Sequence, residues 1–349
     1  VNDLGVAIFG SISEAGTYNI GVKEDYYFPT EELTVLAIAS SGGGGGTYYP
    51  PTPTIVPTNT TEEIKEKKFN TETALDFIIS NQEENGSFGA SLYTDWATLA
   101  LSSATNQDIN SYVKLTKYLS STSTIGAMLT DYERHAMALM SLGLNPYNTN
   151  GENYIQKIIE YFDGNQFGDK EEDNDDIFAL IVLQNAGFDQ KNEMIIKSLE
   201  FILSRQREDG SWDYSTDMTG AVLQVLANNG GNEKFNEYII KANNYLKEKQ
   251  KSDGGWGNVS STSWVIGGLN ALKENLKDWQ KDGKNPIDYL VLQQDEDGGV
   301  KGETLETDIK NRIWQTAYAV IAISGKSWNE IMQKFDRPIE EIVDEKVNE

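Results

Sequence analysis

A glycine-bearing turn recurs along most of the chain at a nearly constant interval, and this period constrains the fold more than any other feature. Gln and acidic residues usually precede the glycine, and an aromatic residue often follows it. The glycines stand at positions 86, 126 (in a degenerate copy), 168, 210, 254 and 298, so that successive steps are 40, 42, 42, 44 and 44 residues. A fixed period of this length indicates a repeated supersecondary unit.

Each repeat contains two segments with helical periodicity, one before and one after the turn. Before the turn, as in residues 199–203, apolar residues follow a 3.6-residue spacing, which is typical of an amphipathic helix. After the turn, as in residues 177–183, the segment is apolar nearly all round, which is typical of a helix buried on both sides. The sequence therefore predicts a mainly α fold, an (α/α)6 toroid of six outer and six inner helices over residues 61–326.

The remaining segments differ from the repeats in composition. Residues 1–40 contain runs rich in β-branched residues and predict short strands, but so short a segment cannot bury a sheet alone. We therefore expect these strands to pair with the toroid, with an upstream segment or with another chain. Residues 41–60 combine a Gly tract with a Pro/Thr tract and predict a linker. Residues 327–349 predict a charged C-terminal helix or tail.

Composition excludes several functions. The net charge of −25 repels nucleic acids and anionic membrane surfaces. The chain has no cysteine and a single histidine, His135, which excludes thiolate metal sites and disulfides. No run of about 18 apolar residues occurs, so we expect no direct membrane insertion. We expect neither a metal nor a cofactor.

Two turn motifs carry a resemblance to a known superfamily. Gln206…Gly210-Ser211-Trp212 and Gln250…Gly254-Gly255-Trp256 resemble the repeat of the squalene-cyclase and protein-prenyltransferase superfamily, and the resemblance covers residues 62–325. It implies that the glutamine closes the outer helix and that the aromatic residue packs in the turn. The missing cysteines exclude the zinc prenyltransferase and thioester branches. We place the chain in a non-catalytic branch of bacterial or archaeal surface proteins.

One motif points instead to catalysis. Asp173-Asn174-Asp175-Asp176 matches the Asp-x-Asp-Asp acid of triterpene and class II diterpene cyclases. Clustered carboxyl groups cannot all ionise together, so one can stay protonated and act as an acid. The resemblance thus implies a catalytic role for Asp173, Asp175 and Asp176. Against it, the motif lies in an acidic run, and Ile177-Phe178 stand where the family has Thr or Ser and a small residue. The resemblance also implies an active site between two helical domains, whereas this chain has one. The competing interpretation is that these acids cap a helix.

The N-termini of all inner helices emerge at one end of the ring, which we call the mouth. Acidic and aromatic side chains recur near these N-termini. A mouth of this kind suits a sugar, a cationic group or a protein loop, although core packing is the alternative for each aromatic residue. The predicted ligand-binding residues are Tyr93, Asp95, Trp96, Tyr132, Asp175, Asp176, Tyr214, Asp217, Trp264, Asp308 and Trp314.

The preferred functional interpretation is an extracellular or cell-surface binding or scaffolding module without enzymatic activity. We expect a protein or glycan partner at the mouth and self-association through the N-terminal strands. The alternative is a class II terpene cyclase that uses the Asp173–Asp176 acid motif.

Overall fold

The computed structural model describes residues 67–104, 108–122, 125–302 and 308–338, together with the backbone of two N-terminal strands. The chain separates into two compact units, residues 1–64 and residues 65–349. In the first unit, β1 (Gly16–Ile20) pairs with β2 (Glu31–Val35) in an antiparallel sheet, with Gly16 opposite Val35. The predicted strands thus occur and pair with each other, whereas the predicted linker, residues 41–60, lies outside the described residues.

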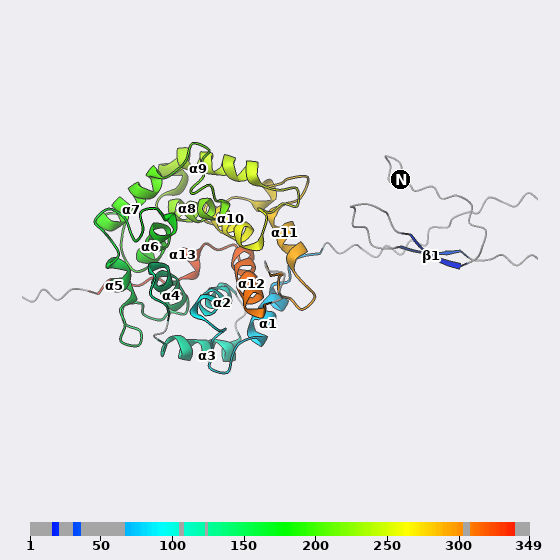
Figure 1. Ribbon diagram of the computed structural model, residues 1–349, viewed down its shortest axis with the longest axis horizontal. Coiled ribbons are helices and arrows are strands. Elements are labelled where there is room, and N and C mark those ends of the chain that lie inside the picture. The colour runs from blue at the N-terminus through cyan, green and yellow to red at the C-terminus, as the bar shows by residue number, and fades with distance from the viewer. Residues whose placement is uncertain are drawn as a thin grey trace, which may run out of the picture. The chain divides into compact units, whose positions relative to one another are not determined.

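The second unit confirms the predicted toroid. Six helix pairs form two concentric layers (Figure 1). Each inner helix contacts the next, and the last inner helix contacts the first, which closes the ring. The inner helices are α2 (Ser91–Ser103), α4 (Leu129–Ser141), α6 (Asp173–Asn185), α8 (Thr216–Asn228), α10 (Val259–Ala271) and α12 (Ile309–Ile323). The outer helices are α1 (Thr71–Ser80), α3 (Ile109–Leu119), α5 (Tyr154–Ile159), α7 (Glu193–Ser204), α9 (Gly231–Lys249) and α11 (Pro286–Gln293).

The apolar pattern of the sequence accounts for this arrangement. Residues 177–183 of α6 are all buried, as expected for a helix with neighbours on every side. Outer helix α7 buries one stripe, Ile195, Leu199 and Ile202, and leaves its other face to solvent. Inner helices α8 and α10 pack with their backbones in close contact, because Gly220 and Gly268 carry no side chain. A Cβ atom on Gly220 would lie 2.6 Å from the carbonyl oxygen of Trp264.

The repeated glutamines join neighbouring repeats. The Gln206 side-chain amide donates hydrogen bonds to the carbonyl oxygens of Gly210, in its own turn, and Tyr238, in the next outer helix. Gln82 makes the same pair of bonds, to Gly86 and to Ser111 in α3. Gln250 donates to Gly254 and to Trp279, which lies in the segment before α11. Gln294 donates to Gly298 and to Asn70 at 2.8 Å. Because Asn70 caps α1, this glutamine ties the last repeat to the first.

The turn aromatics are buried as predicted. Trp212 is fully enclosed, and its indole N–H donates to the carbonyl oxygen of Ile202 at 2.7 Å. Trp256 repeats this arrangement with Leu246 at 2.8 Å. These bonds hold the end of each outer helix against the turn that leads into the inner helix.

The C-terminal segment differs from the predicted charged helix or tail. A short helix, α13 (Trp328–Ile331), is followed by chain without regular secondary structure up to residue 338. Trp328, Ile331 and Met332 are buried, because they pack against the inner helices. The apolar residues thus make this segment part of the toroid, while residues 339–349 lie outside the described residues. Among the described helices, none has the length and hydrophobicity needed to span a bilayer.

Candidate active site

Asp173, the first residue of α6, serves a structural ion pair. Its carboxylate accepts a hydrogen bond from Nε of Arg205 at 2.6 Å, and the side chain is almost fully buried. Burial raises the pKa of Asp173, and the bond to Arg205 opposes that shift. The carboxylate thus holds α6 against the end of α7.

Asp176 holds the turn before α6 in a way that other repeats achieve with threonine. Its Oδ1 accepts the backbone N–H of Phe167 at 3.0 Å. In four other repeats the hydroxyl of a threonine near the start of the inner helix accepts the corresponding N–H at 2.9–3.2 Å: Thr94, Thr219, Thr262 and Thr316. A carboxyl group therefore replaces a neutral hydroxyl at this position.

The second oxygen of Asp176 has no such function. Oδ2 is buried and makes no hydrogen bond within normal geometry. Burial raises the pKa of Asp176 to about 7; the Phe167 N–H and the nearby Ser198 hydroxyl oppose this shift, and the charge of Asp175 adds to it. Near neutral pH this carboxyl group is therefore partly protonated.

Glu133, on α4, was not predicted from the sequence, and it forms a group of three carboxyls with the predicted Asp175 and Asp176. It is fully buried, and both of its carboxyl oxygens lack a hydrogen-bond partner. Burial raises the pKa of Glu133 well above its ordinary value of 4.5; Asp175 and Asp176 raise it further, and Arg134 opposes them. The only sequence signal is a glutamate in a segment that is otherwise part of a buried helix. We call Glu133, Asp175 and Asp176 the carboxyl cluster.

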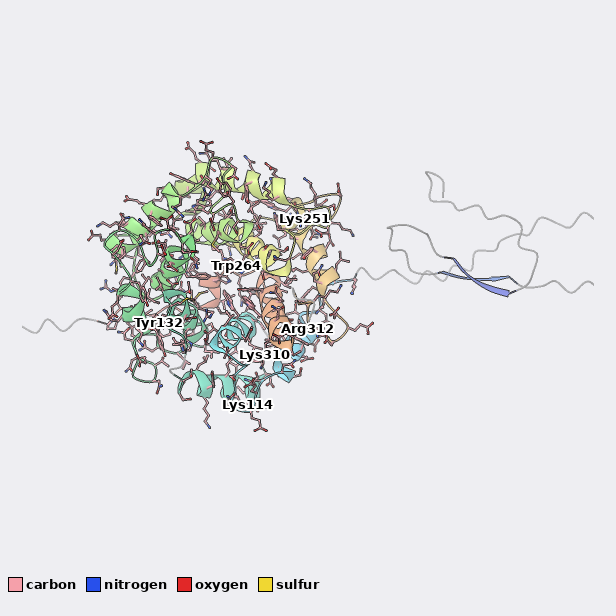
Figure 2. All side chains as sticks on the ribbon, viewed as in Figure 1. Lys114, Tyr132, Lys251, Trp264, Lys310 and Arg312 are labelled. Atoms are coloured by element: carbon pink, nitrogen blue, oxygen red, sulfur yellow. The ribbon has the colours of Figure 1, made fainter. Side chains whose placement is uncertain are left out.

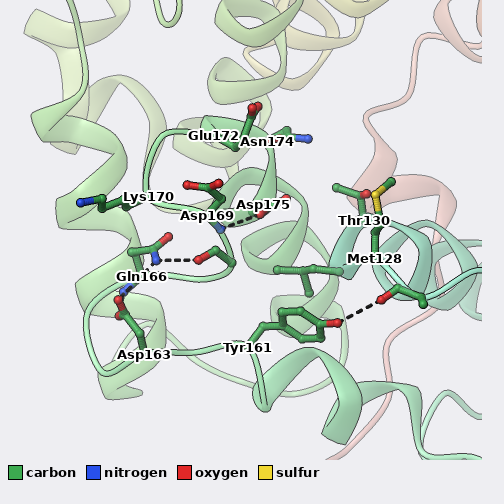
Figure 3. A pocket seen from close by; sticks show the side chains of 13 residues that line it. Met128, Thr130, Tyr161, Asp163, Gln166, Asp169, Lys170, Glu172, Asn174 and Asp175 are labelled. Atoms are coloured by element: carbon green, nitrogen blue, oxygen red, sulfur yellow. Dashed lines mark hydrogen bonds between the residues drawn. The ribbon is translucent and has the colours of Figure 1, made fainter.

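Asp175 connects this cluster to a groove between the N-terminal ends of α4 and α6 (Figure 3). The groove has a volume of about 940 Å³, within the range of ligand pockets. Asp175 lies in its wall, where its Oδ2 accepts the backbone N–H of Asp169 at 2.9 Å. Burial raises the pKa of Asp175, the Asp169 N–H opposes this, and the carboxylates of Glu172 and Asp169 raise it further. Asp175 is the one member of the carboxyl cluster in the groove wall.

Both apolar and polar side chains line the rest of the groove. Met128, Leu129 and Tyr161 form an apolar side, and the Tyr161 hydroxyl donates to the carbonyl oxygen of Ala127 at 3.0 Å (Figure 3). The polar side includes Asn174, Gln166 and several acidic residues. The groove is open to solvent, so the acid motif does not face an enclosed aromatic cavity. The motif is also not fully exposed on the rim of the ring. Within the described part of the chain, no group of three or more His, Asp or Glu residues is placed to hold a metal ion.

Aromatic residues of four inner helices meet inside the ring. We call Trp96, Phe178, Trp264 and Tyr318 the aromatic cluster. The ring centroids of Trp96 and Tyr318 are 4.7 Å apart, and Trp264 lies 6.4 Å from Trp96 and 5.8 Å from Phe178. Figure 2 places Trp264 near the middle of the ring. Asp175 precedes Phe178 by three residues, so both lie on one face of α6, about one turn apart.

The predicted mouth residues do not form a single site. Tyr93, Trp96, Trp264 and Trp314 do come together, since Trp314 lies 6.3 Å from Tyr93 and 5.6 Å from Tyr318. Tyr318 was missed, because a tyrosine in an apolar run resembles any core residue.

The remaining predicted residues lie elsewhere. Tyr132 packs on Tyr161. Tyr214 is exposed and stacks under Arg207. Asp308 is exposed and caps α12, whereas Asp217 lies half-buried in the first turn of α8.

The position of Asp95 contradicts the prediction that the acidic residues line the mouth. It is fully buried between α2 and α4, where His135 lies 3.0 Å and Arg134 3.3 Å from its carboxylate oxygens. Asp95 therefore belongs to a buried polar network and not to an open mouth, because Arg134 on α4 compensates its charge and the His135 ring contacts its other oxygen.

Comparisons with known proteins agree with this architecture. The family model of the squalene-hopene cyclase C-terminal domain matches residues 133–305, a range that includes the whole carboxyl cluster. Among curated proteins, none matches the chain significantly.

Solved structures of the type II terpene cyclase MstE from Scytonema share the fold. The apo enzyme is 12% identical, with a TM-score of 0.55 over 73% of this chain and 96% of that one. A variant in complex with its substrate, geranylgeranyl dihydroxybenzoate, is 10% identical, with a TM-score of 0.54 over 75% and 97%. Another variant, in complex with its product, merosterolic acid A, is 11% identical, with a TM-score of 0.53 over 73% and 95%.

These findings correct the preferred functional prediction. The matched family and the neighbouring structures are terpene cyclases, some with substrate or product bound, which contradicts a non-enzymatic binding module and favours the cyclase alternative. The objection that a single helical domain cannot house a cyclase site fails as well, since MstE is matched over nearly its full length. The chain shares the α/α toroid fold of these cyclases, and residues 133–305 match the squalene-hopene cyclase C-terminal domain.

Proposed function

We propose that the protein is a class II terpenoid cyclase that starts its reaction by protonating an isoprenoid chain. The observation that carries this proposal is the carboxyl cluster beside the groove. Glu133, Asp175 and Asp176 all have raised pKa values, and Asp175 lies in the groove wall. Three carboxyl groups with raised pKa values beside the groove retain protons that they can donate as general acids.

Asp175 is the proposed proton donor. Its carboxyl proton passes to one carbon of a terminal C=C bond, and the other carbon becomes a tertiary carbocation. The electron pair of the next C=C bond closes a ring, and the final carbocation loses a proton to a base or is captured by water. The initiation and closure steps need no oxidant or reductant. Tyr161 is the aromatic residue of the groove wall, and the face of an aromatic ring stabilises nearby positive charge.

The other two carboxyls support this role. Glu133 and Asp176 lie close enough to Asp175 that its negative charge raises their pKa values. Burial and the nearby carboxylates of Glu172 and Asp169 disfavour ionisation of Asp175 and so favour its protonated form. The substrate class follows from the neighbouring enzyme, MstE, whose substrate carries a geranylgeranyl chain.

Product analysis tests the proposal. The protein is incubated with prenyl diphosphates from geranyl to geranylgeranyl and with squalene, and products are identified by mass spectrometry. We expect a cyclised product that is lost in Asp175→Asn and strongly reduced in Asp176→Asn. Asp217→Asn is the control, because Asp217 lies in the first turn of α8, outside the carboxyl cluster. Equal product from Asp175→Asn and the unsubstituted protein would overturn the assignment.

The extracellular location, a protein or glycan partner and self-association through the N-terminal strands remain predictions from the sequence.

A further inference from the structure

The C-terminal segment places one side chain at the centre of the aromatic cluster. The indole of Trp328 is buried, with its ring centroid 5.2 Å from Trp264, 5.4 Å from Phe178 and 5.6 Å from Trp96. It stacks on Phe178 with an interplanar angle of 23°. Figure 1 shows α13 inside the ring of inner helices. Trp328 therefore fills the space that the aromatic cluster would otherwise surround.

Hydrogen bonds to the inner helices fix this position. The backbone N–H of Trp328 donates to Oε1 of Gln224 at 2.9 Å. The side-chain amide of Asn329 donates to the carbonyl oxygen of Ile181 at 2.9 Å and to Oδ1 of Asn185 at 2.7 Å. Asn185 in turn donates to the carbonyl oxygen of Asn329. Both Ile181 and Asn185 belong to α6, the helix that carries Asp175 at its other end.

The geometry of α6 sets the distance between the acid and this plug. Phe178 follows Asp175 by three residues, which is about 4.5 Å along the helix axis. Because Trp328 stacks on Phe178, it closes the interior of the ring about one helical turn from the acid. A chain protonated at Asp175 can therefore occupy the groove but cannot extend through the ring.

We propose that Trp328 is a specificity-determining residue, the floor of the substrate site that limits the length of isoprenoid chain the ring admits. This inference rests on the proposed function, because it takes the ligand to be an isoprenoid. Loss of the indole would open an apolar space inside the ring, bordered by the aromatic cluster and about one helical turn along α6 from Asp175, the kind of cavity that binds hydrocarbons.

Binding of prenyl alcohols of two lengths tests this role without any turnover. Geraniol (C10) and geranylgeraniol (C20) are titrated by calorimetry into the full chain and into Trp328→Ala. We expect Trp328→Ala to bind geranylgeraniol about tenfold tighter, or more, than the unsubstituted protein, since additional CH₂ groups become buried. Affinity for geraniol should change less than threefold.

A second buried tryptophan provides the control. Trp279 is as buried as Trp328, but it packs on Trp256 and receives the Gln250 amide at its carbonyl oxygen, outside the aromatic cluster. Trp279→Ala removes the same side chain and should leave the length dependence unchanged. If Trp328→Ala does not fold, Trp328→Phe retains most of the packing and should give a smaller gain in the same direction.

The outcomes separate this inference from the proposed function. Three results would overturn the role of Trp328. The Trp328 variant could show the same length dependence as the unsubstituted protein, Trp279→Ala could show an equal gain, or the Trp328 variant could fail to bind either alcohol. A gain for the long chain without any cyclised product would instead overturn the proposed function and leave the floor in place.

Discussion

The Asp176 carboxylate accepts the backbone N–H of Phe167 at 3.0 Å, where four other repeats use a threonine hydroxyl for the same bond. A carboxyl group at this position keeps the turn and adds an ionisable oxygen, Oδ2, that is buried near the Ser198 hydroxyl. One residue therefore combines a structural bond common to the repeats with a group suited to acid chemistry.

Asp176→Thr should separate these two roles. The threonine hydroxyl can restore the turn bond and removes the buried carboxyl, so the free energy of unfolding at pH 7 should equal or exceed that of the unsubstituted protein. Asp176→Ala leaves the Phe167 N–H unpaired and should cost about 1–3 kcal/mol. Urea denaturation measures both, and cyclisation should be strongly reduced in each variant. If threonine destabilises as much as alanine, the turn bond has little structural weight.

Glu133→Gln should alter the pH dependence of stability. Folded Glu133 stays protonated above its ordinary pKa of 4.5, whereas unfolded Glu133 ionises there, so unfolding releases a proton. The contribution of Glu133 to stability therefore falls as pH rises from about 4.5 towards its raised folded pKa. The change in the free energy of unfolding that Glu133→Gln causes should be more stabilising at pH 7 than at pH 4, by at least about 1 kcal/mol. The exposed Glu208→Gln is the control, and an equal difference in both variants would contradict the buried, unpaired state of Glu133.

Trp212→Ala should be strongly destabilising. The side chain is fully buried and its indole N–H bonds the carbonyl oxygen of Ile202, so its loss should cost about 3–5 kcal/mol in thermal or urea unfolding. Tyr214→Ala, two residues away and largely exposed, should cost less than about 1 kcal/mol. A loss below about 1 kcal/mol for Trp212→Ala would mean that the turn does not depend on this residue.

Gln294→Ala tests how the ring closes. Removing its amide leaves the carbonyl oxygens of Asn70 and Gly298 without this donor and should cost about 1–3 kcal/mol. Gln280, whose amide bonds an exposed carbonyl oxygen within its own loop, is the control and should change stability by less than about 0.5 kcal/mol on substitution by alanine. Equal unfolding midpoints in the two variants would show that the Gln294 bonds do not stabilise the junction.

Sequence reasoning predicted what depends on local pattern. The period of the turn glycines, the buried Trp212 and the two kinds of helix follow from residue spacing, because each repeat is stabilised by its own turn and its immediate neighbours. The carboxyl cluster does not follow in this way. Asp175 and Glu133 stand 42 residues apart, and only the packing of α4 against α6 brings them together. Trp328 escaped prediction for the same reason, since its partners come from four inner helices and its own segment is too short to show a period.

A deuterium-labelling experiment tests the central claim, protonation of an isoprenoid chain by Asp175, most directly. The best substrate of the prenyl series is incubated in D₂O, where the carboxyl proton of Asp175 exchanges for deuterium before each turnover. We expect the cyclised product to carry one deuterium on the carbon that Asp175 protonates, and Asp175→Asn to form no such product. A cyclised product without deuterium, or the same labelled product from Asp175→Asn, would contradict the account.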